Sequence, residues 1–113
     1  MRTTIYHNPR CGKSRETLRL LEDRGEKPVV IEYLNTPPSA ADLKRILRML
    51  DKSPRELIRR KEASDAGIDP AKLSDEQLIT AMVRNPIIIE RPVVVKGGKA
   101  ALGRPPESVL DIL

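Results

Sequence analysis

The chain has 113 residues, with 21 Lys and Arg against 16 Asp and Glu and a net charge of +5 when its single His is neutral. Its length suits one domain, and its 10 Ile, 13 Leu and 7 Val can fill an aliphatic core. Because it has two Tyr and no Phe or Trp, the aromatic side chains on which single-stranded nucleic acid stacks are nearly absent.

One Cys and one His exclude several kinds of site. A structural zinc site takes four ligands and a catalytic one usually three from the protein, so Cys and His cannot form either here. A single Cys also excludes a disulfide within the chain, which favours a reducing compartment. No apolar run approaches the ~20 residues of a membrane span, and the first residues lack the apolar region of a signal peptide. We therefore expect a cytoplasmic protein without a metal or a membrane partner.

The first third of the chain predicts a β-α-β unit. Residues 3–6 form a β-prone run that ends at His7-Asn8-Pro9. A helix follows over 13–24, with Gly25 as its C-terminal stop, and 28–34 read as a buried strand. A crossover helix between two strands predicts that they pair in parallel.

Three helices are predicted in the middle of the chain. Ser39 and Asp42 resemble a capping box at the start of the first. Residues 53–60 predict a second, short helix that begins with an N-cap and a Pro. Residues 61–73 have few apolar side chains and predict a loop, and 74–77 cap the third helix. The positions expected to face inward are Leu43, Ile46, Leu47, Leu50, Leu78, Ile79, Met82 and Val83.

The last third predicts two antiparallel strands and a short helix. Residues 93–95 and 100–102 are joined by Lys96-Gly97-Gly98-Lys99, a hairpin signal, and 107–113 form the helix. The expected order is β-α-β, three helices and β-β-α. We therefore predict one domain over residues 1–113, with an α/β fold, a mixed sheet and a helical insertion at about 39–84.

The loop after the first strand contains the only thiol, Cys11, at the start of the following helix. The N–H groups and partial positive charge of a helix N-terminus favour the thiolate, and Arg10, Lys13 and Arg15 add positive charge. His7 can contribute as an imidazolium or a hydrogen-bond donor. The alternative is a small buried hydrophobe, as most free cysteines are. Apolar cores do not surround a thiol with cations, so we predict a reactive Cys11.

Several arginines lie at the ends of predicted elements: Arg59 or Arg60, Arg91 and Arg104. Guanidinium groups bind oxyanions through paired hydrogen bonds. A following Pro, present after Arg91 and Arg104, restricts the backbone and thereby the direction of the side chain. Spacing alone still favours solvated surface charges, which is the ordinary state of Arg.

The Cys11 loop differs from that of a cysteine phosphatase, which needs an Arg six residues after the Cys, where this chain has Thr17. Cys11 and Ser14 instead form a C-x-x-S arrangement. This is the attacking thiol of a thioredoxin-like loop without its resolving partner.

Several motifs spread over nearly the whole chain occur in order. They are Ile5-Tyr6-His7-Asn8-Pro9-Arg10-Cys11, Ser14-Arg15, Tyr33-Leu34, Pro37-Pro38, Leu57-Ile58-Arg59, Asn85-Pro86, Glu90-Arg91-Pro92-Val93-Val94-Val95 and Gly103-Arg104-Pro105. Together they resemble the glutaredoxin-coupled arsenate reductase (ArsC) family, and most of all its short, YfgD-like branch. The resemblance implies a thioredoxin-like fold with a helical insertion, which agrees with the order of elements predicted above.

The resemblance also implies roles for individual residues. Cys11 would be the nucleophile, and His7 and Arg15 would complete an H-x₃-C-x₃-R loop that lowers its pKa. The residues that match the family's oxyanion-binding arginines are Arg59, Arg91 and Arg104, with Arg60 as an alternative to the first. The residues that would shape the site are Gly12, Ser14 and Pro92, the last as a cis proline.

The reaction implied by the resemblance is the reduction of arsenate to arsenite, as in arsenical resistance. Glutathione would be the co-substrate and glutaredoxin the protein partner, with no bound cofactor. The single Cys agrees, because no internal disulfide can supply the two electrons. We expect a monomer without a nucleic-acid partner.

Two other functions fit the same fold. An Spx-like regulator that binds RNA polymerase would sense oxidants with a C-x-x-C switch, but Ser14 stands at the second position. A monothiol glutaredoxin-like transferase would use Cys11 to resolve glutathione mixed disulfides.

Overall fold

The computed structural model describes residues 2–113. The chain divides into two compact units, one formed by residues up to 36 together with 91–113 and the other by 37–90. The second unit contains the segment predicted as a helical insertion. The organisation as one domain stays a prediction.

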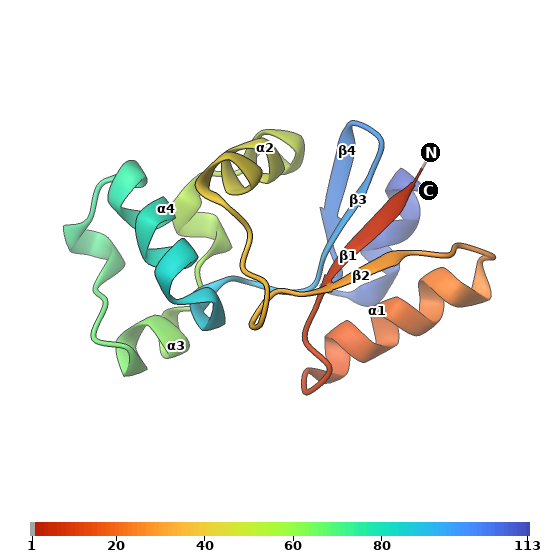
Figure 1. Ribbon diagram of the computed structural model, residues 1–113, viewed down its shortest axis with the longest axis horizontal. Helices are drawn as coiled ribbons and strands as arrows, with labels where there is room; N and C mark the ends of the chain where they lie inside the picture. The colour runs from red at the N-terminus through yellow and green to blue at the C-terminus, as the bar shows by residue number, and fades with distance from the viewer. Residues whose placement is uncertain (1) are drawn as a thin grey trace. The chain divides into compact units, whose positions relative to one another are not determined.

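The first unit is built on a mixed four-stranded sheet (Figure 1). Strand β1 (Thr3–His7) leads into helix α1 (Gly12–Asp23) and then strand β2 (Val29–Glu32). A hairpin of β3 (Val93–Lys96) and β4 (Lys99–Leu102) completes the sheet in the order β2-β1-β3-β4. The β1–β2 pair is parallel and the other two pairs are antiparallel, so the predicted parallel pair and the predicted antiparallel hairpin are confirmed.

One face of this sheet carries the core of the first unit. Ile5 of β1 pairs with Val94 of β3, and both are fully buried. Leu21 of α1 and Val109 of the last helix, η4 (Pro106–Ile112), complete the cluster. The predicted last helix is therefore present, as a 3₁₀-helix. Because α1 packs on the sheet, its N-terminal end is fixed beside the loop that follows β1.

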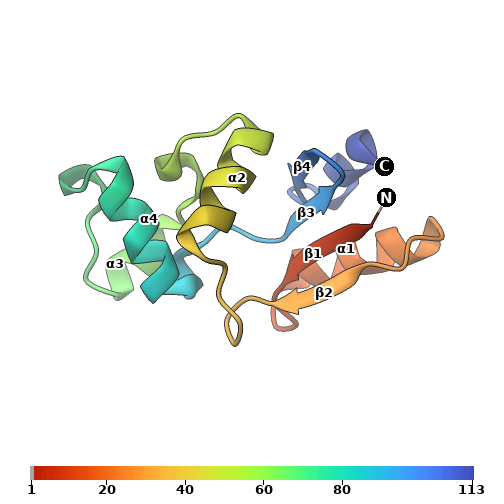
Figure 2. The ribbon, with the colours of Figure 1, turned by 45° about the horizontal axis from the view of Figure 1, so that its top comes forward.

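The strand predicted over 28–34 is shorter and more exposed than expected. It spans Val29–Glu32 at the edge of the sheet (Figure 2), where it pairs with β1 alone. Val29 and Val30 are 39% and 44% exposed, so the prediction of a buried strand was wrong. The chain then turns, because the N–H groups of Asn35 and Thr36 both donate to the carbonyl oxygen of Glu32, at 3.0 and 2.9 Å.

The second unit is helical. Its elements are α2 (Ala40–Leu50), η1 (Pro54–Leu57), α3 (Arg60–Asp65), η2 (Pro70–Lys72), α4 (Asp75–Arg84) and η3 (Pro86–Ile88). The capping boxes that begin α2 and α4 are confirmed. The inward positions of these helices are also confirmed, except that Leu50 and Val83 are only half-buried. No helix among residues 2–113 is long and apolar enough to cross a membrane.

Two predictions in the second unit were wrong. The helix predicted over 53–60 ends at Leu57, and Ile58 is extended and forms an antiparallel bridge with Ile89. The segment 61–73, predicted as a loop, contains most of α3 and all of η2. A single fully buried side chain, Ala63, anchors α3, and one apolar position gives no helical periodicity to detect.

Candidate active site

Cys11 lies between β1 and α1, as the sequence predicted. It is the N-cap residue of α1, with φ −94° and ψ 122°, and its side chain is partly exposed. Its N–H donates to the carbonyl oxygen of Asn8 at 3.0 Å, and its own carbonyl accepts from the N–H of Arg15 at 3.0 Å. The first bond closes the loop and the second begins the helix, so the backbone on both sides of the thiol is fixed.

The pKa of Cys11 lies below its ordinary value. Burial alone would raise this pKa, but hydrogen bonds from the N–H of Ser14, the side chain of Arg91 and the N–H of Lys13 lower it, as does the charge of Arg91. The N–H donors belong to the first turn of α1, where backbone N–H groups have no partner within the helix. The environment therefore favours the thiolate, which is the nucleophilic form.

His7 and Ser14 form a buried pair beneath the loop. His7 is 6% exposed and Ser14 is fully buried, with 2.6 Å between Nδ1 of the ring and Oγ of the serine. The N–H of Asn8 also donates to this Oγ, at 3.0 Å. Burial lowers the pKa of His7, and the Arg15 charge lowers it further against an opposing effect of the Glu32 carboxylate. A neutral ring can accept a hydrogen bond from the Ser14 hydroxyl at Nδ1.

Two of the predicted arginines are connected to this site. The side chain of Arg91 lowers the pKa of Cys11, and Nε of Arg104 donates to the carbonyl oxygen of Arg91 at 2.9 Å. Both arginines precede a cis peptide bond, to Pro92 and Pro105, so the cis Pro92 expected from the resemblance is present. The structure thus links Cys11, Arg91 and Arg104, which come from three separate parts of the sequence.

Arg15 and Gly12 belong to the first turn of α1, directly after Cys11. Nη1 of Arg15 donates to the carbonyl oxygen of Pro9 at 2.9 Å, so this side chain fixes the loop before Cys11. Gly12 is the first residue of α1. His7 is bonded to Ser14, as described above, and not to the sulfur. Direct stabilisation of the thiolate by His7 or Arg15 stays a prediction.

Arg59 belongs to the second unit and is held by two carboxylates. Its Nε lies 2.8 Å from Glu62 and its Nη1 lies 2.8 Å from Glu90. The hydrogen bond to Glu62 raises the pKa of Arg59, burial lowers it, and Glu90 raises it again. The adjacent Arg60 is exposed and begins α3. A role of Arg59 in binding an oxyanion stays a prediction.

Gly103 is a site feature that the sequence reasoning missed. Its N–H donates to the carbonyl oxygen of Pro92 at 2.9 Å. A Cβ atom at this position would lie 2.4 Å from Oγ1 of Thr17 and 2.7 Å from Cγ of Pro92. Only glycine therefore lets the chain after β4 pass between α1 and Pro92, which places Arg104 beside Arg91. A Gly before an Arg-Pro step was visible in the sequence, but the close approach to α1 was not.

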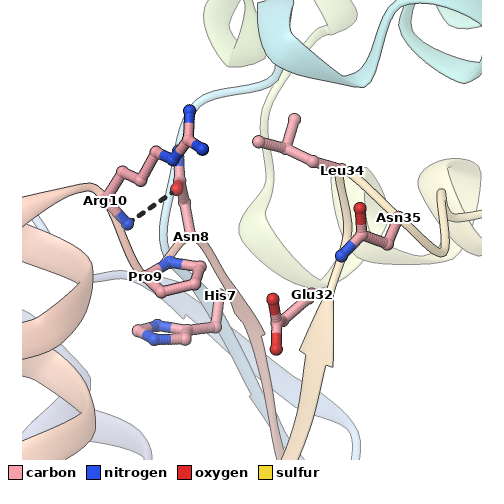
Figure 3. Close-up of a pocket in the computed structure, with 7 residues that line it drawn as sticks. All are labelled: His7, Asn8, Pro9, Arg10, Glu32, Leu34 and Asn35. Carbon is pink, nitrogen blue, oxygen red and sulfur yellow. Dashed lines mark hydrogen bonds between the residues drawn. The ribbon is translucent and has the colours of Figure 1, made fainter.

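A cavity of about 480 Å³ opens beside the loop that carries Cys11 (Figure 3). One wall is formed by residues 7–10 and the other by Glu32, Leu34 and Asn35. The parallel pairing of β1 with β2 sets His7 opposite Glu32, and both walls begin at this point.

Among the described residues, no three His, Cys, Asp or Glu side chains gather as ligands for a metal ion.

Comparisons with known proteins identify the family. The family model described as "ArsC family" matches residues 6–112. The uncharacterized protein YfgD of Escherichia coli strain K12 is 54% identical, over 96% of this chain and 94% of its own length. The arsenate reductase of Rhizobium meliloti strain 1021 is 44% identical, over 100% of this chain and 82% of its own. The solved structure of an arsenate reductase from Vibrio cholerae matches with a TM-score of 0.93 at 49% identity, covering 100% of this chain and 98% of that one. With its α/β, thioredoxin-like fold, the chain belongs to the ArsC family.

Proposed function

We propose that the protein is an arsenate reductase that uses Cys11 as its nucleophile. The observation that carries this proposal is the contact of Arg91 with a cysteine whose pKa is lowered, with Arg104 bonded to the carbonyl of Arg91. A nucleophile beside two cations suits a tetrahedral oxyanion substrate. The names of the family relatives from Rhizobium meliloti and Vibrio cholerae point to arsenate as that oxyanion.

In the first step, the Cys11 thiolate attacks arsenic(V). The S–As bond forms and a protonated oxygen leaves as water, so a thiol and H₂AsO₄⁻ give Cys11–S–AsO₃H⁻ and H₂O. Arg91, Arg104 and the N–H groups at the start of α1 offset the negative charge on the oxygens. Arg59 is proposed as a third arginine for the oxyanion, on its match to the family motif alone.

In the second step, the thiol of glutathione attacks the Cys11 sulfur. The electron pair of the S–As bond passes to arsenic, which becomes arsenic(III) and leaves as H₂AsO₃⁻, and a Cys11–glutathione disulfide forms. The two sulfur atoms supply the two electrons. Glutaredoxin then takes the glutathione by thiol exchange and restores Cys11. The presence of one Cys supports this external reductant, and the cycle needs no bound cofactor.

The test is an arsenate reduction assay with glutathione and glutaredoxin. We expect turnover by the wild type, none by Cys11→Ser, and a loss of about tenfold or more for Arg91→Ala or Arg104→Ala. Arg24→Ala is the matched control, because Arg24 lies at the opposite end of α1 from Cys11. Arg59→Ala and Arg60→Ala test which of these neighbours contributes. Equal rates for the wild type and Cys11→Ser would contradict the proposal.

A further inference from the structure

The cavity beside the Cys11 loop has the position and size of a ligand site. It lies where the parallel strands β1 and β2 end at His7 and Glu32, and open α/β sheets bind ligands at the carboxyl ends of their strands. Its volume of about 480 Å³ is within the range for small-molecule pockets. It is distinct from the Cys11–Arg91 contact, because neither residue lines it.

Three polar side chains on its walls, those of Glu32, Arg10 and Asn35, make no hydrogen bond or ion pair within the described part of the protein. Among residues 2–113, no salt bridge involves Glu32 or Arg10, and the side-chain amide of Asn35 makes no hydrogen bond. All three residues are exposed. Figure 3 shows the Glu32 carboxylate directed toward the opposite wall and the Arg10 side chain extending from its own. A carboxylate and a guanidinium therefore face one cavity and are available to a ligand.

These groups define the chemistry of that ligand. Glu32 suits an ammonium group, Arg10 suits a carboxylate, and the Asn35 amide can donate or accept. Pro9 and Leu34 offer apolar surface for a short carbon chain. An α-amino-acid group carries both an ammonium and a carboxylate, so it offers one partner to each of these two side chains.

The wall formed by residues 7–10 continues directly into Cys11. The N–H of Cys11 donates to the carbonyl of Asn8, which lines the cavity. A ligand held against this wall is therefore next to the segment that presents the thiol. We propose that the cavity binds the α-amino-acid group of a small thiol, which is the co-substrate that attacks the Cys11 sulfur. This inference rests on the proposed function, because it locates the reductant of that reaction.

Binding can be measured without redox chemistry. S-Methylglutathione and S-methylcysteine both carry the α-amino-acid group and neither can form a disulfide. With the ¹⁵N-labelled full chain, we expect shifts of the His7, Arg10 and Asn35 amides. A stronger response to S-methylglutathione identifies a peptide thiol, and a stronger response to S-methylcysteine identifies the free amino acid. Acetylation of the ligand's amine removes its charge and is expected to weaken binding about tenfold.

Glu32→Gln tests the assigned contact, because it removes the charge and keeps the shape. We expect its Kd for the preferred ligand to rise about tenfold, and Asn35→Ala to weaken binding in the same direction. Glu22→Gln is the control, since Glu22 is an exposed acid of α1 outside the cavity. The proposal is overturned if wild-type pocket amides do not shift, or if Glu32→Gln binds as tightly as the control.

Kinetics separates this proposal from the proposed function. We expect Glu32→Gln to lower the ratio of kcat/KM for glutathione to kcat/KM for 2-mercaptoethanol about tenfold, because the latter has no amino-acid group. An unchanged ratio overturns the cavity as the co-substrate site. No arsenate turnover with either thiol contradicts the proposed function, and the binding measurement then decides the cavity by itself.

Discussion

The hydroxyl of Ser14 lies 2.6 Å from Nδ1 of His7, while the backbone N–H of the same serine helps to lower the pKa of Cys11. One residue thus fixes the buried histidine with its side chain and lowers the pKa of the thiol with its backbone. The N–H of Asn8 adds a third bond, to the same hydroxyl. The position of the Cys11 loop on the first turn of α1 depends on this serine.

Ser14→Ala is expected to destabilise the protein by about 1–3 kcal/mol, because it leaves the buried Asn8 N–H and His7 ring without this partner. Urea unfolding measures the change. Ser64→Ala is the control, since Ser64 is exposed on α3, and its effect should stay within about 0.5 kcal/mol. Equal stabilities of the two variants would show that the buried hydroxyl contributes nothing.

The rate of Cys11 alkylation against pH should give an apparent pKa below the free value of about 8.5. Arg91→Met is expected to raise that pKa, because the Arg91 hydrogen bond and charge both lower it. Arg24→Ala, at the other end of α1, should leave it unchanged. A wild-type value at or above that of free cysteine would contradict the description of the loop.

Gly103→Ala is expected to cost about 1–3 kcal/mol, because the new Cβ would overlap Oγ1 of Thr17 and Cγ of Pro92. Adding Thr17→Ala removes part of this overlap and should recover part of the stability. Gly98→Ala is the matched control, since no atom lies within 4 Å of a Cβ built there. Urea unfolding of five proteins, namely the wild type, Gly103→Ala, Thr17→Ala, the double variant and Gly98→Ala, tests the close approach, and additive losses in the double variant would argue against it.

The buried His7 predicts a specific pH dependence of stability. Its pKa is lowered in the folded state, so the unfolded chain binds the proton more readily. The contribution of His7 to the free energy of unfolding is fully present above its unfolded pKa of about 6.5. It is lost as the pH falls below that value. The free energy of unfolding should therefore fall from pH 7 to pH 5 in the wild type. His7→Asn should show a flatter profile over this range, and an equal slope would contradict the assignment.

Carboxylates with lowered pKa values affect the free energy of unfolding in a lower pH range than His7 does. Hydrogen bonds from Thr3 and Lys96 lower the pKa of Glu26, and bonds from Ser53 lower that of Glu56. The contributions of these carboxylates to the free energy of unfolding are present above an unfolded pKa of about 4.3. They are lost as the pH falls below that value. Measurements between pH 5 and pH 7 therefore report on His7 with little effect of these groups.

The local features of the site were predictable because they are encoded by neighbouring residues. Asn8-Pro9 ends β1, and Gly25, with φ +80°, follows the C-terminal end of α1. Together these place Cys11 at the start of a helix. The contacts of Arg91 and Arg104 are not local, because they depend on the passage of Gly103 against Thr17.

Other features depend on how many partners a segment has in the fold. Val29 and Val30 are typical of a buried strand, but β2 pairs on one side only and both are exposed. The caps at 53–56 are real, yet the helix ends early because the N–H of Arg59 bonds to the carbonyl of Ile88, at 2.7 Å. Pairing with a distant segment overrides a local helix signal here.

The two-unit organisation has a consequence for how such a protein can diverge. The groups that lower the pKa of Cys11 belong to the sheet unit, either on α1 or at Arg91, where the chain returns to that unit. Substitutions in the first turn of α1 or at Arg91 are therefore a direct route by which related chains can acquire a more or a less acidic thiol on the same sheet.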